Sequence, residues 1–171
     1  GGSLTIAMNA EGYGLDPALG WSTIDIMMSL SYYENLLMVQ PDLSRKPVLA
    51  TSWEANEDLT SYTFHLREGV KFHHGKEFKA EDVIFTYNRI LDPELGSPGR
   101  TLIEGIVNMI ALDDYTVRFD LDAANAFFPD ATASHIMRIL PADVDVERLT
   151  LEEFGTGPFM IEEHLPGERT V

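Results

Sequence analysis

Residues 62–75 read Tyr62-Thr63-Phe64-His65-Leu66-Arg67-Glu68-Gly69-Val70-Lys71-Phe72-His73-His74-Gly75. In the first half of this stretch, Tyr62, Phe64 and Leu66 alternate with polar residues, which is the period of a β-strand with one buried face. The glycines at 69 and 75 favour turns after it. The stretch therefore predicts a half-buried strand followed by two turns.

A partner for this strand lies just before it in the sequence. Residues 53–55 are strand-like, and the polar residues 56–60 are typical of a hairpin loop. The aromatic side chains of Trp53 and Phe64 are interpreted as core residues that anchor the hairpin, because buried aromatics commonly do so.

A second hairpin is predicted over residues 106–121. Residues 106–112 and 115–121 are apolar segments that flank the turn pair Asp113-Asp114. Its buried face is expected to carry four side chains, those of Tyr115, Val117, Phe119 and Leu121.

Two helices are predicted from apolar residues at helical spacing. The first spans about residues 22–35, where an apolar stripe would consist of Ile26, Leu30, Tyr33 and Leu37. The second begins near Glu81 and Asp82, whose charges suit a helix N-terminus, and ends at Asp92-Pro93. Its apolar face is formed by Val83, Ile84, Tyr87, Ile90 and Leu91.

Three further short strands complete the predicted elements. They are expected at residues 4–9, 36–39 and 158–165. The resulting fold class is mixed α/β (α+β), with antiparallel hairpins and two main helices. The last strand runs towards Val171 without a closing element, so we expect the segment to belong to a longer fold.

Composition excludes several classes of function. Twelve basic and twenty-eight acidic residues give a formal net charge of -16, which repels nucleic acid and anionic lipid surfaces. The sequence has no cysteine, so a thiol nucleophile or thiolate metal site is unavailable. No P-loop, Rossmann glycine pattern or G-x-S-x-G motif occurs, and no cofactor is implied.

Pairs of neighbouring titratable residues are interpreted as surface residues, without a role in metal binding or catalysis. His73 and His74 are adjacent and without a second ligand motif, so a surface turn is favoured over a metal site. The acidic pairs Glu152-Glu153 and Glu162-Glu163 are interpreted as solvated faces.

Seven blocks, in this order, resemble the family 5 extracellular solute-binding proteins of ABC transporters, the oligopeptide-, dipeptide- and nickel-binding group. The most specific is residues 62–75, quoted above. The other six, in chain order, are residues 4–9, Leu15-Asp16-Pro17, Tyr33-Glu34-Asn35-Leu36-Leu37, Leu49-Ala50-Thr51-Ser52-Trp53-Glu54, Ala80-Glu81-Asp82-Val83 and Gly155-Thr156-Gly157-Pro158-Phe159.

The resemblance implies part of lobe 1 of a bilobed periplasmic-binding-protein type II fold. Residues 1–40 would start lobe 1, residues 41–153 would form an extra α/β subdomain, and residues 154–171 would return to lobe 1. The second lobe would be absent from this chain.

The resemblance also implies a ligand cleft between the lobes. By position, its residues in this chain would be Gly20, Trp21, Ser22, Thr23, Ser97, Gly99, Arg100, Met137 and Arg138. Trp21 would offer a flat apolar surface, Ser22 and Thr23 would hydrogen-bond an extended ligand, and Arg100 or Arg138 would pair with a ligand carboxylate. The alternative for each of these residues is an ordinary surface loop position.

The function implied is capture of peptides or a similar small solute outside the cytoplasm, at the periplasmic or extracellular face of the cell membrane. Delivery to ABC transporter permease subunits would follow, with membrane contact only through a lipid anchor and with no catalytic residues. Nickel, heme or oligosaccharide are alternative ligands within the family. An alternative of another class is a stand-alone α/β enzyme or regulatory domain.

Overall fold

The computed structural model describes residues 6, 12, 14–20, 22–165 and 168–171. The α-helices in these ranges are α1 (Thr23–Tyr32), α2 (Ala80–Leu91), α3 (Arg100–Ile103) and α4 (Phe128–Thr132). The strands are β1 (Leu37–Val39), β2 (Arg45–Pro47), β3 (Ala50–Ala55), β4 (Ser61–Leu66), β5 (Ile106–Asp113), β6 (Thr116–Leu121), β7 (His164–Leu165) and β8 (Arg169–Thr170). A short 3₁₀ turn covers Arg148–Thr150.

The main sheet is antiparallel, with strand order β3-β4-β6-β5. Both predicted hairpins are confirmed: Trp53 pairs with Phe64 in the first, and Ile110 pairs with Arg118 in the second. The two hairpins join through β4 and β6, where Phe64 faces Val117. The mixed α/β fold class is therefore confirmed.

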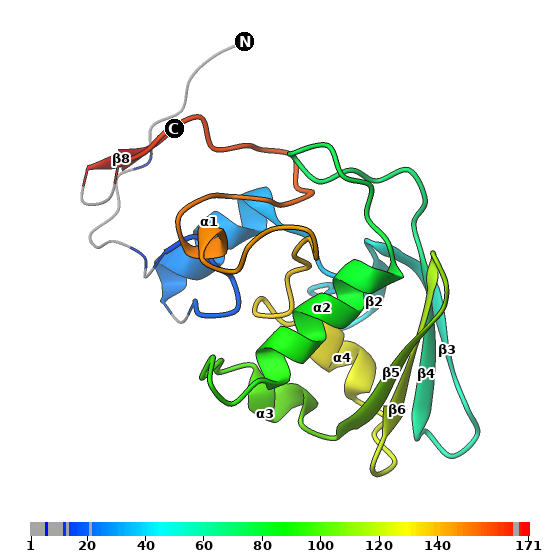
Figure 1. Cartoon of the computed structure of the whole chain (residues 1–171). Coiled ribbons are helices and arrows are strands. Elements are labelled where there is room, and N and C mark those ends of the chain that lie inside the picture. The colour runs from blue at the N-terminus through cyan, green and yellow to red at the C-terminus, as the bar shows by residue number, and fades with distance from the viewer. Residues whose placement is uncertain (1–5, 7–11, 13, 21, 166–167) are drawn as a thin grey trace.

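Helix α2 crosses the inner face of this sheet, with α3 and α4 beside it (Figure 1). The period-2 pattern of β4 and β6 places their apolar side chains on that face, where they are buried. Three aromatic rings meet there: the Phe119 centroid lies 5.0 Å from that of Tyr87 and 5.3 Å from that of Phe128. The Tyr87 hydroxyl is buried without a hydrogen-bond partner in the described structure.

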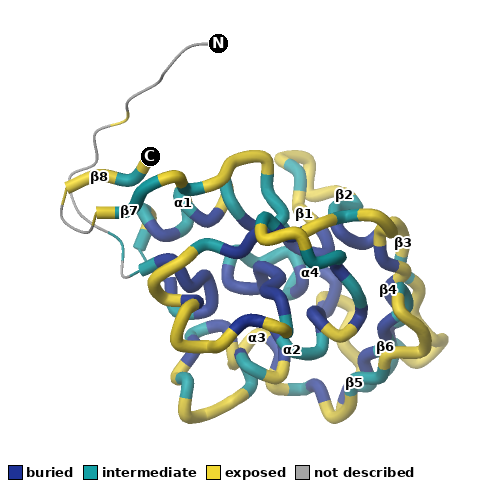
Figure 2. The backbone as a smooth tube through the Cα atoms, turned by 45° about the horizontal axis from the view of Figure 1, so that its top comes forward, coloured by how far each residue is buried: buried dark blue, intermediate teal, exposed yellow. Residues whose placement is uncertain are grey.

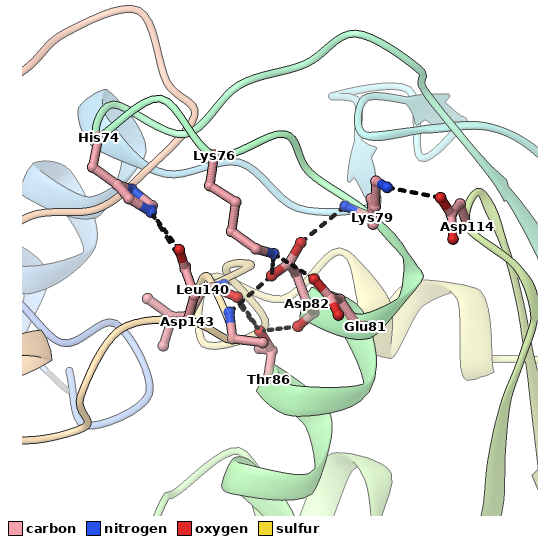
Figure 3. A network of polar contacts seen from close by, with 10 residues as sticks. His74, Lys76, Lys79, Glu81, Asp82, Thr86, Asp114, Leu140 and Asp143 are labelled. Carbon is pink, nitrogen blue, oxygen red and sulfur yellow. Dashed lines mark hydrogen bonds and ion pairs between the residues drawn. The ribbon is translucent and has the colours of Figure 1, made fainter.

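The N-terminus of α2 is held by a buried carboxylate, that of Asp82. It accepts the backbone N–H groups of Lys79 and Ala142 at 2.9 and 2.8 Å, and it pairs with the Lys76 ammonium (Figure 3). Burial raises the pKa of Asp82. Burial alone would lower the pKa of Lys76, but the hydrogen bonds of Lys76 to Asp82 and Glu81 together outweigh it, so the pKa of Lys76 is raised. The network ties α2 to the chain near residue 142.

Helix α1 is shorter than predicted, and it buries other side chains than the predicted ones. It ends at Tyr32 rather than near residue 35, because Tyr33 has extended backbone angles. The predicted apolar stripe is wrong at Leu30, which is 51% exposed, whereas the polar Asp25 and Ser29 are buried. Asp25 is buried because it caps the helix, as described below.

The C-terminal segment also departs from the prediction. Residues 158–163 form no strand, and only residues 164–165 (β7) pair, with 169–170 (β8). The predicted strand 36–39 is confirmed as β1, which pairs with β2. The expected strand at 4–9 lies outside the described residues, except for residue 6.

Buried hydrophobic side chains of the described residues form two clusters. The buried stretches of the chain are dark blue in Figure 2. The larger cluster lies between the main sheet and α2, α3 and α4. The smaller joins the end of α1 to the later chain and contains Tyr33, Leu140, Val144, Leu149 and Phe154. Across the described ranges, we find no helix with the length and hydropathy needed to cross a bilayer.

Candidate ligand-binding site

Three of the segments predicted to line the ligand site come together in the structure. The Ser97 hydroxyl donates a 2.6 Å hydrogen bond to the Ala18 carbonyl oxygen, which ties the loop after α2 to the turn at 15–20. Gly99 packs on Ile136 and Met137 without room for a side chain. The loop at 97–100 therefore bridges the other two segments.

The turn at 15–20 is fixed to α2 by a buried ion pair. The guanidinium of Arg89 donates from both terminal nitrogens to the carboxylate of Asp16, at 3.0 Å for the Nη1 bond. Asp16 Oδ1 also accepts the Ala18 N–H at 3.0 Å. At the end of the turn, a Cβ atom on Gly20 would lie 2.9 Å from Asp25 Cβ, so a glycine is required there.

Ser22 begins α1 through a capping box with Asp25. The Ser22 hydroxyl accepts the Asp25 N–H at 3.1 Å, and Asp25 Oδ2 accepts the Ser22 N–H at 2.9 Å. The same hydroxyl donates to Asp25 Oδ2 at 2.8 Å. Thr23 is exposed, and Trp21 lies outside the described residues. Ser22 therefore has a structural task, and its contact with a ligand stays a prediction.

Arg138 is a buried cation with unused hydrogen-bonding capacity. One terminal nitrogen donates to the Tyr33 carbonyl oxygen at 3.2 Å, while the buried Nε has no partner. No carboxylate oxygen of the described residues lies within 4.0 Å of its nitrogens, so Arg138 forms no ion pair with them. Burial lowers the pKa of Arg138 to about 10, against a weaker opposing effect of the Glu34 charge.

The Gly155-Thr156-Gly157 segment runs beside the end of α1. The Gly157 N–H donates to the Tyr32 carbonyl oxygen at 2.7 Å, and the Thr156 hydroxyl donates to Glu34 Oε2 at 2.9 Å. The Glu34 carbonyl oxygen accepts the Ile139 N–H at 3.0 Å, next to Arg138. Glu34 and Thr156 were not predicted as site residues, although both stand in the blocks that carry the resemblance.

The surface-loop alternative is wrong for five of the predicted site residues, because they are buried: Gly20, Ser97, Gly99, Met137 and Arg138. Arg100, by contrast, is exposed at the start of α3. Arg138 and Arg100 therefore differ sharply in environment, although the resemblance implies the same role for both.

Two structural interpretations of titratable residues are confirmed for one residue of each pair and wrong for the other. The His73 side chain is only 10% exposed and the Glu153 side chain only 3%, and their atoms Nδ1 and Oε1 lie 2.6 Å apart. Glu152 is exposed, but the side chain of Glu153 is not on a solvated face. His73 lies in a turn, as predicted, but its side chain is buried. Its neighbour His74 pairs with Asp143 at 3.2 Å in a more exposed position (Figure 3). In the part of the chain that the structure describes, no cluster of three His or acidic residues could hold a metal ion.

Short segments from distant parts of the chain thus meet here: the loop at 97–100 contacts both the turn at 15–20 and residues 136–137. The sequence model of the bacterial extracellular solute-binding proteins, family 5 Middle, matches residues 45–171. The chain belongs to this family of bacterial extracellular solute-binding proteins.

Individual relatives agree with this assignment. The chain is 36% identical over 148 residues to the dipeptide-binding protein of Escherichia coli K12, covering 72% of this chain and 28% of that protein. It is 30% identical over 177 residues to the dipeptide-binding protein of Pseudomonas aeruginosa, covering 86% and 33%. It is 34% identical over 142 residues to the heme-binding protein A of Haemophilus influenzae, covering 67% and 26%. The chain thus spans a third or less of the length of these relatives.

Solved structures share the fold. The ABC transporter-associated periplasmic binding protein DppA of Helicobacter pylori, in complex with the peptide STSA, superposes with a TM-score of 0.83 at 32% identity, covering 94% of this chain and 36% of that one. The binding protein AgaA of Agrobacterium tumefaciens R10, in complex with agropinic acid, gives a TM-score of 0.88 at 28% identity, covering 94% and 33%. The chain is similar to proteins named for binding, not for catalysis.

Proposed function

We propose that the protein captures a small solute bearing a carboxylate, with peptides as the first choice, and that Arg138 anchors that carboxylate. The observation that carries this proposal is a buried guanidinium without a carboxylate partner among the described residues. Burying an unpaired cation is costly, so an anionic ligand would offset that cost.

The relatives support the choice of solute. Several are named for dipeptides or di/tripeptides, one for glutathione, and a structural neighbour holds agropinic acid. All these solutes carry a carboxylate group. The heme named for another relative also carries carboxylates, so heme is the second candidate. Nickel and oligosaccharide have no comparable argument in this chain.

In the lobe division proposed from the resemblance, Arg138 would belong to the extra subdomain of lobe 1. Residues 1–40 and 154–171 would form lobe 1 and residues 41–153 its extra subdomain, with a second lobe closing over the solute. Hinge closure of that kind retains a solute without covalent chemistry. We propose delivery to the permease of an ABC importer, at the periplasmic or extracellular face of the membrane, and no enzymatic activity.

Calorimetric titration tests the anchor directly. The 171-residue chain and the full-length protein encoded by its gene are each titrated with four ligands. These are a dipeptide, the same dipeptide amidated at its C-terminus, heme and Ni²⁺. We expect the free dipeptide to bind, and the amidated one to bind about tenfold to a hundredfold more weakly, because a charge-assisted hydrogen bond contributes about 1.5–3 kcal/mol.

Arg138→Gln should weaken dipeptide binding by a similar factor, while the exposed Arg100→Gln serves as the matched control and should bind normally. Thermal unfolding of both variants shows that each is folded. Binding that is indifferent to the C-terminal carboxylate and to Arg138 refutes the anchor. Chemical conversion of the titrated solute refutes the binding function itself.

A further inference from the structure

Glu34 and Arg138 carry opposite charges on neighbouring segments of the chain, yet they form no ion pair with each other. One terminal nitrogen of Arg138 donates to the carbonyl oxygen of Tyr33, in the peptide group that leads into Glu34. The backbone N–H of Ile139 donates to the Glu34 carbonyl oxygen at 3.0 Å. The two side chains therefore start from adjacent backbone positions, while their charged atoms stay more than 4.0 Å apart.

Further hydrogen bonds hold these two segments together independently of any ligand. The side-chain amide of Asn35 donates to the carbonyl oxygens of Thr132 and Ser134, at 3.2 and 2.6 Å. Tyr33 and Asn35 are buried, whereas Glu34 between them is partly exposed. A contact group that is already held in place loses less conformational entropy when a ligand binds, so the position of Glu34 suits a ligand contact.

The carboxylate of Glu34 keeps most of its hydrogen-bonding capacity free. Its Oε2 atom accepts the Thr156 hydroxyl at 2.9 Å, and its Oε1 atom accepts no hydrogen bond from the described residues. An ionised carboxylate offers about four lone-pair sites. A Cβ atom on Gly155 or Gly157 would lie 1.8 or 2.7 Å from the Tyr32 carbonyl oxygen, so glycines are required on both sides of Thr156. Thr156 is thereby fixed where it orients one oxygen of Glu34 and leaves the other free.

We propose that Glu34 accepts a hydrogen bond from an N–H group of the solute, next to the carboxylate that Arg138 anchors. The inference rests on the proposed function, because it adds a second contact to the same site. In a peptide, the carbon atom that bears the C-terminal carboxylate also bears the last amide nitrogen. One end of the ligand thus presents a negative acceptor and an N–H donor side by side, which complements a guanidinium and a carboxylate that are not paired with each other.

This second contact narrows the class of solute. Solutes with an amino or amido nitrogen on the carbon next to the carboxylate, peptides among them, carry the N–H donor at the required position. A heme propionate carries a carboxylate without that donor. Its binding to Arg138 would place two negative charges near each other without a hydrogen bond to Glu34, and like charges brought together in this way disfavour the wrong ligand. Heme, the second candidate above, is therefore the poorer ligand.

Replacing a single N–H group of the ligand tests the inference on the full-length protein encoded by the gene. Calorimetry compares alanyl-alanine with alanyl-lactate, in which an ester oxygen replaces that N–H. We expect alanyl-lactate to bind about tenfold to a hundredfold more weakly, because a charge-assisted hydrogen bond is lost. The comparison uses the wild-type protein, so it does not depend on the folding of any variant.

Glu34→Ala links this difference to the Glu34 carboxylate. In this variant, the dissociation constants of the two ligands should agree within about twofold, because the acceptor is gone. Glu152→Ala removes an exposed glutamate that pairs with Arg148, and as the matched control it should keep the full difference. Thermal unfolding shows that both variants are folded.

The possible results separate this inference from the proposed function. If alanyl-alanine binding depends on Arg138 but alanyl-lactate binds equally well, the inference is overturned while the carboxylate anchor stands. If Glu34→Ala still distinguishes the two ligands as the wild type does, Glu34 is not the acceptor and the inference is likewise overturned. If alanyl-alanine does not bind, or binds without regard to Arg138, the anchor and the inference fail together.

Discussion

Gly99 lies so close to Ile136 that a Cβ atom on residue 99 would come within 2.3 Å of the Ile136 Cγ2 atom. The backbone angles of Gly99 are those of an ordinary helical residue, with φ -70° and ψ -16°. The glycine is therefore required by packing and not by backbone conformation. This contact is where the loop at 97–100 meets the chain that leads into Arg138.

Gly99→Ala should destabilise the protein by about 1–3 kcal/mol, because the added methyl group overpacks a buried contact. Thermal unfolding measures the loss. Gly105→Ala is the matched control, since its Cβ would meet only the carboxylate of the exposed Asp122 at 3.0 Å. Equal stability of the two variants would contradict the close contact at Ile136.

Asp82→Ala should cost about 3–5 kcal/mol, because it leaves the buried end of Lys76 and two backbone N–H groups without their acceptor. Urea unfolding gives the free energy. Glu81→Ala removes the other, 60% exposed partner of Lys76 and should change stability by less than about 1 kcal/mol. A similar loss from both substitutions would show that Asp82 is not the central residue of this network.

The ion pair between Arg45 and Asp130 should make the protein sensitive to acid. The hydrogen bonds from Arg45 lower the pKa of Asp130, so its contribution to stability is present above the ordinary value of 3.8 and is lost as the pH falls through the lower folded value. Wild type and Asp130→Asn should therefore differ in stability at pH 7 and converge near pH 2. A difference that persists at pH 2 would contradict this linkage.

The net charge of -16 should make stability depend on salt. Repulsion between carboxylates opposes the compact state, and salt screens it within a Debye length of about 10 Å at 0.1 M. The melting temperature should rise as NaCl increases from 10 to 300 mM, and a second monovalent salt at equal ionic strength should act equally. A melting temperature that falls over this range would show that attractive ion pairs dominate instead.

The sequence was most informative where local pattern and burial coincide. The alternation at Tyr62, Phe64 and Leu66 predicts both the strand and its buried face, because helices cover only one face of the sheet. The helical spacing around Val83 and Tyr87 likewise predicts α2. These elements are confirmed almost to the residue.

Prediction failed where polar groups are buried. Asp25 is buried because it caps α1 beside Gly20, and Glu153 because His73, 80 residues earlier, bonds it. Periodicity reports the polarity of a residue but not the partner that satisfies it. The Ser22-x-x-Asp25 spacing was a readable sign of the capping box, whereas no local pattern links His73 to Glu153.

That the positions taken from the resemblance line a ligand site stays a prediction. The positions taken from the resemblance include Ser97, Gly99 and Met137, which the structure brings into one region. The distinction between the buried Arg138 and the exposed Arg100 depends on tertiary packing, and their neighbours in sequence do not show it.

The pairing of β4 with β6 has a consequence for how the chain folds. Each hairpin closes a short loop, but Tyr62 meets Phe119 only after the whole intervening chain, including α2, has been brought together. Such non-local closure costs chain entropy before the stabilising contacts can form, and this slows folding. Joining of the two preformed hairpins around α2 is therefore the expected rate-limiting step, and truncating Phe64 or Phe119 should slow refolding more than truncating a side chain within either loop.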